Sequence, residues 1–219
     1  MPFTSGAVAH VDSYKQGAFF SYEFVGENSW NGYERNCLFA NAGDGQFIDV
    51  ARPTGSDCIK DSRGVAIADF NQDGRLDLVI NNNNDEPTLY FNDVGLSGNW
   101  IEIKLAGCPS NRDAIGARVR LVAGGKTMTR QVEGGSGYAS QMMLPVFFGL
   151  GAATRIDHLE IDWPSGSKQV FDEAALRSLN GVNRVAWIEE GENNVTAIGV
   201  PQAARGQLTC RTDAKKSAL

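Results

Sequence analysis

A run of nine residues, Asp69-Phe-Asn-Gln-Asp-Gly-Arg-Leu-Asp77, restricts what this chain can fold into more than any other feature. It places oxygen-bearing side chains at its first, third, fifth and ninth positions around a glycine, Gly74. Calcium takes six to eight oxygen ligands at about 2.3–2.6 Å, and glycine permits the sharp turn that directs several side chains at one ion. The run therefore predicts a calcium-binding loop.

The expected ligands are the side chains of Asp69, Asn71, Asp73 and Asp77 and the backbone carbonyl of Arg75. An EF-hand would need a glutamate at loop position twelve and a helix on each side. That position is Ile80, and the flanking residues 64–69 and 76–80 are short aliphatic runs typical of strands. We expect a calcium loop between two strands. The alternative is a polar hairpin turn in which Asp and Asn bond their own backbone.

The loop and its surroundings resemble a known repeat. Residues 64–77, followed by Leu78-Val-Ile-Asn-Asn82 and Leu89-Tyr-Phe-Asn92, look like the FG-GAP or VCBS repeat of integrin-type β-propellers, whose blades carry such calcium loops. The segment at 36–49 resembles the lead-in to that repeat. The resemblance implies one blade and part of another. Fewer than a hundred residues are too few for the four or more four-stranded blades of a closed propeller.

The second half of the chain carries a series of motifs in a fixed order. They are Asn99-Trp-Ile-Glu-Ile-Lys-Leu, Ser110-Asn-Arg-Asp-Ala-Ile-Gly, Gly134-Gly-Ser-Gly-Tyr, Phe148-Gly-Leu-Gly and Trp163-Pro-Ser-Gly. Together they resemble the ASPIC/UnbV domain, which follows FG-GAP-type repeats in secreted relatives of the cartilage acidic protein family, including bacterial ones. The resemblance covers about residues 36–190. No enzymatic activity is securely attached to this domain, so the resemblance implies a non-enzymatic protein.

The expected fold class is all-β, with a partial propeller-like repeat followed by a β-sandwich or barrel-like domain. Polar residues at 93–98 suggest a boundary, which gives a repeat region at 1–95, an ASPIC/UnbV-like domain at 96–190, and a closing strand and tail at 191–219. Alternating or clustered apolar residues predict strands near 17–25, 33–40, 46–50, 88–92, 100–105, 117–122, 127–132, 144–148, 156–163, 168–171, 184–188 and 195–200. Residues 173–179 are expected to be helical. Period-two alternation places Leu159, Ile161 and Trp163 on one inward face.

Catalytic signatures are weak in this sequence. Ser136 lacks the glycine two residues later that a nucleophile elbow needs, and neither His10 nor His158 has a recognisable nucleophile partner. Asp157, Glu160 and Asp162 lie close together in the sequence, a grouping that suggests the paired carboxylates of a glycosidase. Alternation along the strand instead places Glu160 and Asp162 together on its solvent-facing surface. We expect no catalytic site.

Four cysteines, Cys37, Cys58, Cys108 and Cys210, show no zinc-type spacing. Both Cys37 and Cys58 flank the same predicted blade, so a disulfide between them is one expectation, and four buried free thiols are the other. The first ten residues have no basic segment or long apolar core, so no signal peptide is visible. The family resemblance nevertheless implies an extracellular or cell-surface protein.

These features favour a calcium-binding, non-enzymatic interaction or adhesion module with a protein or matrix partner. An open set of propeller strands leaves unpaired edges, so the chain is expected to self-associate as an oligomer or filament, with residues 17–25 as the exchanged strand. A net charge of −6 argues against nucleic-acid binding, and no apolar run is long enough to span a membrane. One alternative is calcium-dependent carbohydrate binding through Trp30, Tyr33 or Tyr138. The other is an accessory protein or hydrolase of a biosynthetic pathway.

Overall fold

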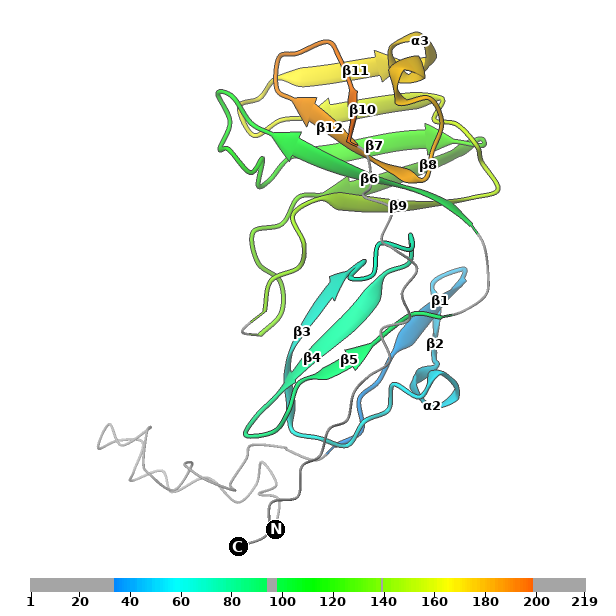
Figure 1. Cartoon of the computed structure of the whole chain (residues 1–219), viewed down its shortest axis with the longest axis vertical. Helices are drawn as coiled ribbons and strands as arrows, with labels where there is room; N and C mark the ends of the chain where they lie inside the picture. Colours follow the sequence, from blue (N-terminus) through cyan, green and yellow to red (C-terminus); the bar gives the residue numbers. More distant parts are fainter. Residues whose placement is uncertain (1–33, 94–97, 139, 199–219) are drawn as a thin grey trace, which may run out of the picture.

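The computed structural model describes residues 34–93, 98–138 and 140–198, and strands dominate this part of the chain (Figure 1). Residues 34–93 form a repeat region with two small sheets, and residues 98–198 form a separate pair of larger sheets. The all-β fold class predicted from the sequence is confirmed. The expected strand at 17–25 lies outside the described residues.

The repeat region contains a two-stranded hairpin, a single helical turn and a three-stranded sheet. The hairpin pairs β1 (Phe39–Gly43) with β2 (Gln46–Asp49), and the turn is α2 (Ala51–Thr54). The sheet is an antiparallel meander of β3 (Ser62–Ala68), β4 (Asp77–Asn82) and β5 (Thr88–Tyr90). Both strands predicted beside the calcium loop are present and pair directly with each other, from Ser62↔Asn82 to Ala68↔Asp77.

Two details of this region differ from the sequence-based expectation. The first described strand begins at Phe39 rather than near residue 33, and the helical turn α2 was not predicted. Four residues are too few to show helical periodicity, and a proline, Pro53, lies within them. The turn ends at Gly55, whose left-handed conformation (φ 71°) lets its amide donate to carbonyls of the turn.

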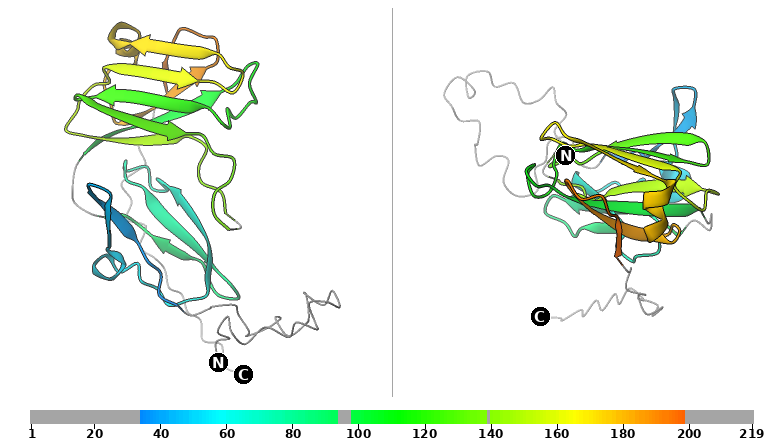
Figure 2. Two further views of the ribbon diagram at one scale, coloured as in Figure 1. Left: turned by 180° about the vertical axis from the view of Figure 1, so that it is seen from behind. Right: turned by 90° about the horizontal axis from the view of Figure 1, so that it is seen from above.

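The second region is a β-sandwich of two four-stranded sheets. One sheet has the order β11-β10-β7-β8 and the other β13-β12-β6-β9, with β12 parallel to β6 and every other pair antiparallel. The strands are β6 (Asn99–Ala106), β7 (Arg118–Ala123), β8 (Lys126–Gln131), β9 (Val146–Gly151), β10 (His158–Asp162), β11 (Lys168–Asp172), β12 (Arg184–Glu189) and β13 (Thr196–Ile198). The view from above in Figure 2 shows the sheets as stacked layers.

Alternating residues from both sheets fill the space between them. On β10 and just beyond it, Leu159 and Ile161 are fully buried and Trp163 is 4% exposed, so the predicted inward face is confirmed. Ile101 and Ile103 of β6 and Phe148 of β9 join the same cluster. Neither sheet closes on itself, which selects the sandwich over the barrel among the two expected forms.

The predicted helix at 173–179 is present as α3 (Glu173–Leu176) followed by the 3-10 turn η2 (Arg177–Leu179). Asp172 caps α3, because its carboxylate accepts a hydrogen bond of 2.9 Å from the amide of Ala175. The helix is short because Asn180 adopts a left-handed conformation (φ 50°) directly after η2. None of the described helices is long and apolar enough to cross a membrane.

The repeat region has almost no apolar core of its own. Only Ala51 and Ile80 are buried there among its described apolar residues. Its exposed large apolar side chains are Phe39, Phe47, Ile48, Ile59, Phe70, Leu89 and Phe91, each between 46% and 63% exposed. Every residue of β1 and β2 is exposed. An isolated hairpin of this kind is only marginally stable in water.

The expected pairing of Cys37 with Cys58 is wrong, because both are free thiols in the structure. They are not buried thiols either, since Cys37 is exposed and Cys58 half-buried. The two backbones nevertheless run close together, as the amide of Asn36 donates to the carbonyl of Cys58 at 3.0 Å. Cys108 is also free and exposed, and Cys210 lies outside the described residues.

Candidate metal-binding loop

The predicted calcium loop connects β3 to β4 at the end of the repeat region that faces the sandwich (Figure 1). Asp69 directly follows β3, and Asp77 is the first residue of β4. The chain turns through two left-handed residues, Gln72 (φ 58°) and Gly74 (φ 85°). This places the five predicted ligand residues within one tight connection, as the spacing requires.

The side chains of Asp69, Asn71 and Asp73 meet around the backbone amides of the loop. The amide of Asp73 donates both to Asp69 Oδ1 (3.0 Å) and to Asn71 Oδ1 (3.1 Å). The amide of Gly74 donates to Asp69 Oδ2 at 2.7 Å, and that of Arg75 donates to Asp73 Oδ1 at 2.9 Å. These bonds are the Asx-type turn bonds named above as the alternative to a metal site.

Asp77, the last predicted ligand, accepts hydrogen bonds from other backbone amides than this cluster does. It is fully buried, and its Oδ2 accepts from the amide of Phe70 at 2.9 Å. Its Oδ1 accepts from the amide of Asn92 at 2.8 Å. Both oxygens therefore hold the backbone together, joining the start of the loop to the chain after β5.

Arg75 was expected to offer only its carbonyl oxygen, and its side chain has a role that the sequence did not suggest. The guanidinium forms an ion pair with the carboxylate of Asp73, and its Nε donates to the carbonyl of Asn92. A positive charge thus already lies beside one of the expected calcium ligands. A calcium ion bound to Asp73 would compete with this guanidinium.

The pKa of the Asp69 carboxyl is raised, mainly by burial. Hydrogen bonds from the Gly74 and Asp73 amides act in the opposite direction and lower this pKa. The carboxylates of Asp73 and Asp77 add to the increase. The pKa of Glu102, on β6 of the sandwich, is also raised, first by burial and then by the Asp69 carboxylate. Negative charge is therefore concentrated at the loop and across its contact with the sandwich. A divalent cation would relieve this repulsion.

The donor chemistry of the loop fits calcium, since three carboxylates and one amide oxygen lie within nine residues. Their arrangement in the structure is that of a loop closed on its own amides. Among residues 34–93, 98–138 and 140–198, no group of three or more His, Cys, Asp or Glu side chains is arranged to hold a metal ion. The calcium site remains a prediction.

The loop also contacts the sandwich, which the sequence did not predict. Gly74 lies against the indole of Trp100 on β6 so closely that a Cβ built on Gly74 would be 1.9 Å from Trp100 Nε1. The indole in turn stacks on Phe147 of β9, with ring centroids 5.6 Å apart. Trp100, Glu102 and Phe147 occupy the strand positions that alternate with the core residues, so the loop rests on the outer face of this sheet.

The polar residues 81–86 lie at the end of β4 and in the turn that leads to β5. Asn82 among them is 4% exposed and is hydrogen-bonded within the hairpin. Its Nδ2 donates to the carbonyl of Glu86 (2.7 Å) and to Thr88 Oγ1 (3.0 Å), while its Oδ1 accepts from Ser62 Oγ. Asn82 therefore stabilises the turn from β4 to β5.

Glu160 and Asp162 of β10 lie on the outer face of their sheet, as the alternating pattern predicted, and they take part in an ion-pair network. Glu160 accepts from Arg120 (3.1 Å) and Lys168 (2.8 Å), and Lys168 also pairs with Asp162 (3.2 Å). Hydrogen bonding from Lys168 holds the pKa of Glu160 below its usual value. A general acid of a glycosidase needs the opposite shift.

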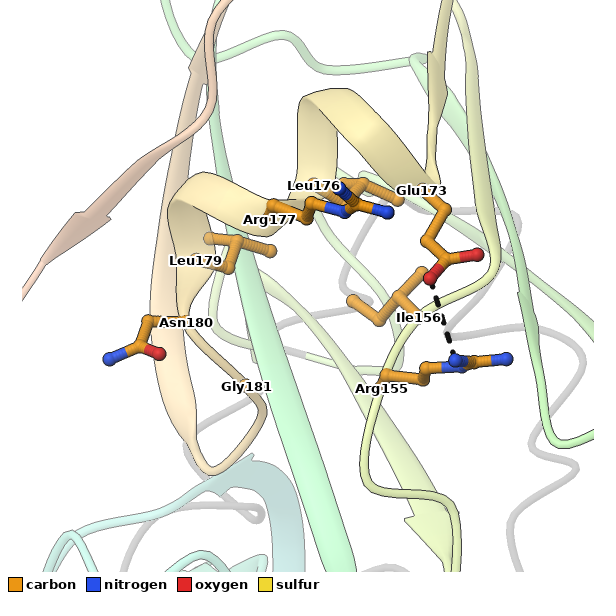
Figure 3. Close-up of a pocket in the computed structure, with 8 residues that line it drawn as sticks. All are labelled: Arg155, Ile156, Glu173, Leu176, Arg177, Leu179, Asn180 and Gly181. Carbon is orange, nitrogen blue, oxygen red and sulfur yellow. Dashed lines mark hydrogen bonds and ion pairs between the residues drawn. The ribbon is translucent and has the colours of Figure 1, made fainter.

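A shallow pocket lies between α3 and the segment before β10 (Figure 3). Ile156, Leu176 and Leu179 are buried beside it, and Arg155 and Glu173 lie at its rim. The Arg155 guanidinium pairs with Glu173 at 3.4 Å and with Asp157 at 3.2 Å. Its charge is therefore largely neutralised, and the pocket lining contains no cysteine, histidine or serine.

A buried glutamate, Glu190, was missed by the sequence analysis. It is 6% exposed, and its Oε1 accepts from the hydroxyls of Ser165 and Ser167. Its Oε2 accepts from the amides of Cys108 (2.8 Å) and Ser110 (2.7 Å). Burial opposes the charged form, but hydrogen bonds from the three serines outweigh it and lower the pKa of Glu190 to about 2. No local pattern reveals this cluster, because its members are up to 82 residues apart.

Comparison with known proteins agrees with both resemblances. The family described as FG-GAP-like repeat matches residues 24–80, which include the whole candidate loop. The family described as ASPIC and UnbV matches residues 107–194, which include most of the sandwich.

Curated relatives match over a short part of the chain. Cartilage acidic protein 1 of Xenopus tropicalis and that of Homo sapiens are each 50% identical to it over 57 residues, and the Mus musculus protein is 48% identical. Each match covers 26% of this chain and 9% of the relative. The chain thus aligns with about a tenth of each of these proteins. Residues 24–80, which include the loop at 69–77, are therefore similar to an FG-GAP-like repeat, and residues 107–194, which include most of the sandwich, are similar to an ASPIC and UnbV domain.

Proposed function

We propose that this protein is a calcium-binding, non-enzymatic interaction module that acts outside the cell or at its surface. The observation that carries the proposal is the loop between β3 and β4, where five donor residues at calcium-ligand spacing lie in one tight turn. Calcium would be held by the side chains of Asp69, Asn71, Asp73 and Asp77 and by the Arg75 carbonyl. It would add positive charge to a loop that holds three carboxylates and a single guanidinium, that of Arg75.

Calcium binding is tested by isothermal titration of the full chain and by thermal melting with calcium or a chelator. At a calcium concentration of about 100 times the dissociation constant, linkage predicts a stabilisation of about 2.7 kcal/mol. Asp73→Ala should remove this response, because it deletes a calcium-ligating carboxylate. Asp73 is exposed, so its side chain is not part of the buried structure. Asp44→Ala is the matched control, since Asp44 is an exposed aspartate with positive φ in another turn of the same region. Identical melting of the parent protein with and without chelator would refute the site.

The apolar surface of the repeat region supports the interaction role. Phe47 and Ile48 are neighbours on β2, so they project to opposite sides of a hairpin that is exposed throughout. Exposed large apolar side chains that gather in one region are typical of a binding site for another protein. The partner favoured here is a second copy of the chain, through pairing of hairpin or sheet edges. A protein of the extracellular matrix is the other candidate.

The extracellular assignment is supported by the cartilage acidic proteins that match part of the chain. Calcium loops of modest affinity suit the millimolar calcium outside cells. Immunodetection of the tagged native protein in culture medium and in cell fractions tests the assignment. Retention of all the protein inside the cell would refute it.

Carbohydrate binding is the second candidate function. Tyr138, on the loop between β8 and β9, is 75% exposed. An aromatic ring must be exposed in this way to stack on a sugar. The other two aromatic residues proposed for this role, Trp30 and Tyr33, lie outside the described residues. Glycan-array binding that requires calcium and is lost in Tyr138→Ala would favour this function over protein binding.

A further inference from the structure

We infer that the sandwich takes part in the calcium response of the loop, because Gly74 of the loop is seated on Trp100 of β6. In this arrangement, calcium binding in residues 69–77 and docking of the loop on the sandwich stabilise each other. The inference deepens the proposed function and depends on it. It assigns to Trp100, which lies outside the repeat, an effect on calcium affinity.

The contact at Gly74 is too close for any side chain. A Cβ at this position would lie 1.9 Å from Nε1, 2.4 Å from Cδ1 and 2.7 Å from Cε2 of Trp100. The glycine is therefore needed twice, for its left-handed conformation (φ 85°) and for the approach of the ring. A change in the path of the loop at Gly74 must displace the indole or separate the two regions.

Trp100 is a firmly held platform for this contact. Its amide donates to Asn183 Oδ1 at 2.9 Å, and its carbonyl accepts from the amide of Asn183 at 2.7 Å. Its indole stacks on Phe147 with an interplanar angle of 12°. Hydrogen bonds of its backbone and stacking of its side chain thus hold Trp100 in place. A change in the environment of the indole would therefore indicate a movement of the loop.

On the loop side, Gly74 is bonded directly to the first predicted ligand, since its amide donates to Asp69 Oδ2 at 2.7 Å. A calcium ion that recruits this carboxylate would change the position of Gly74 against the indole. Glu102, two residues after Trp100 on the same strand face, carries a carboxylate that interacts unfavourably with Asp69. Calcium would remove this repulsion, which otherwise opposes docking.

The test is a calcium titration of the full chain that is monitored by two methods, calorimetry and NMR spectroscopy. Calorimetry gives the dissociation constant, and the ¹H–¹⁵N signal of the Trp100 indole, assigned with Trp100→Phe, reports the contact. We expect the Trp100 signal to shift with the dissociation constant found by calorimetry, and the signal of Trp163 in the sandwich core to stay in place. Trp100→Ala should weaken calcium binding about five- to tenfold, as for a modest coupling between sites.

Two glycine variants separate an effect at the loop from the general cost of placing alanine in a left-handed conformation in the repeat region. Gly43 has a left-handed conformation like that of Gly74 (φ 91° against 85°), but a Cβ at Gly43 would meet nothing within 4 Å. Gly43→Ala should therefore leave calcium affinity within about twofold of the parent. Gly74→Ala should weaken it by about tenfold or more. Adding Trp100→Ala to Gly74→Ala should recover part of this loss, because the clash is removed.

Each result has a distinct meaning. Calcium binding with an unmoved Trp100 signal and parental affinity in Trp100→Ala would overturn the coupling and leave the calcium module intact. Failure of Trp100→Ala to recover any affinity in the Gly74→Ala background would also overturn it. No heat of calcium binding to the parent chain would refute the proposed function, and the coupling with it.

Discussion

Asp77 Oδ1 accepts a hydrogen bond of 2.8 Å from the amide of Asn92, so the residue that opens β4 also holds the chain that follows β5. Its other oxygen holds the amide of Phe70. Among the predicted calcium ligands, Asp77 alone is fully buried. Both of its carboxylate oxygens accept hydrogen bonds from backbone amides. Its contribution to stability is separable from any contribution to metal binding.

We expect Asp77→Ala to destabilise the protein even when calcium is absent. The substitution leaves two backbone N–H groups without their acceptors, and losing hydrogen bonds to a buried charged group costs about 2–4 kcal/mol in total. Urea unfolding in chelator measures this loss. Asp73→Ala serves as the comparison, since it should lower stability by less than about 1 kcal/mol in chelator. Equal stability of the two variants in chelator would show that Asp77 has no such structural role.

Trp163→Ala should strongly destabilise the sandwich. The indole is 4% exposed within the core cluster, and truncating a buried tryptophan to alanine costs about 3–5 kcal/mol. Its Nε1 has no hydrogen-bond partner in the described part of the chain. Trp163→Phe should therefore lose less than half as much, because it keeps most of the apolar contact. A melting temperature of Trp163→Ala within a degree or two of the parent would contradict the assignment of this residue to the core.

Glu190 should make the sandwich less stable in acid. Its pKa is about 2 in the folded protein against an ordinary value of 4.5, so between these values the unfolded chain binds more protons. The stabilisation is therefore complete above about pH 4.5 and is lost as the pH falls toward 2. After allowance for solvent near this loop cluster, we expect a loss of about 1–2 kcal/mol.

The measurement is urea unfolding of the parent and of Glu190→Gln at several pH values from 2 to 6. Glu190→Gln should be less stable at pH 6 and should show a shallower pH dependence. Glu192→Gln, which removes an exposed carboxylate two residues away, should follow the parent curve. Parallel curves for the parent and Glu190→Gln would contradict the depressed pKa.

Self-association should depend on the exposed hairpin of the repeat region. We expect the parent chain with calcium to elute as an oligomer in size-exclusion chromatography with light scattering. Replacing Phe47 and Ile48 together by serine should shift it to monomer, because it removes the two neighbouring apolar side chains of β2. Val170→Ser is the control, since Val170 is a comparably exposed apolar residue (54%) on the sandwich. A monomer for the parent, unchanged by deletion of residues 1–25, would refute self-association.

Much of the fold follows from local sequence alone. Period-two alternation identified the inward face of Leu159, Ile161 and Trp163, and it did so because a strand with one buried face repeats every second residue. The spacing of polar residues around Gly74 predicted a tight connection between two strands. Few residues other than glycine tolerate the left-handed backbone conformation that the chain adopts at Gly74. The two family resemblances rest on the same kind of short, ordered motif.

Only the tertiary structure decided the features that join distant segments. The partition of eight strands into two sheets, with β12 parallel to β6, depends on long-range pairing that no local pattern contains. Long-range packing also brings Gly74 against the indole of Trp100. It likewise brings Ser110, Ser165 and Ser167 to the carboxylate of Glu190. Local sequence determines which face of a strand is apolar and where the chain can turn. Which polar groups meet is set by packing, because it depends on how already formed sheets come together.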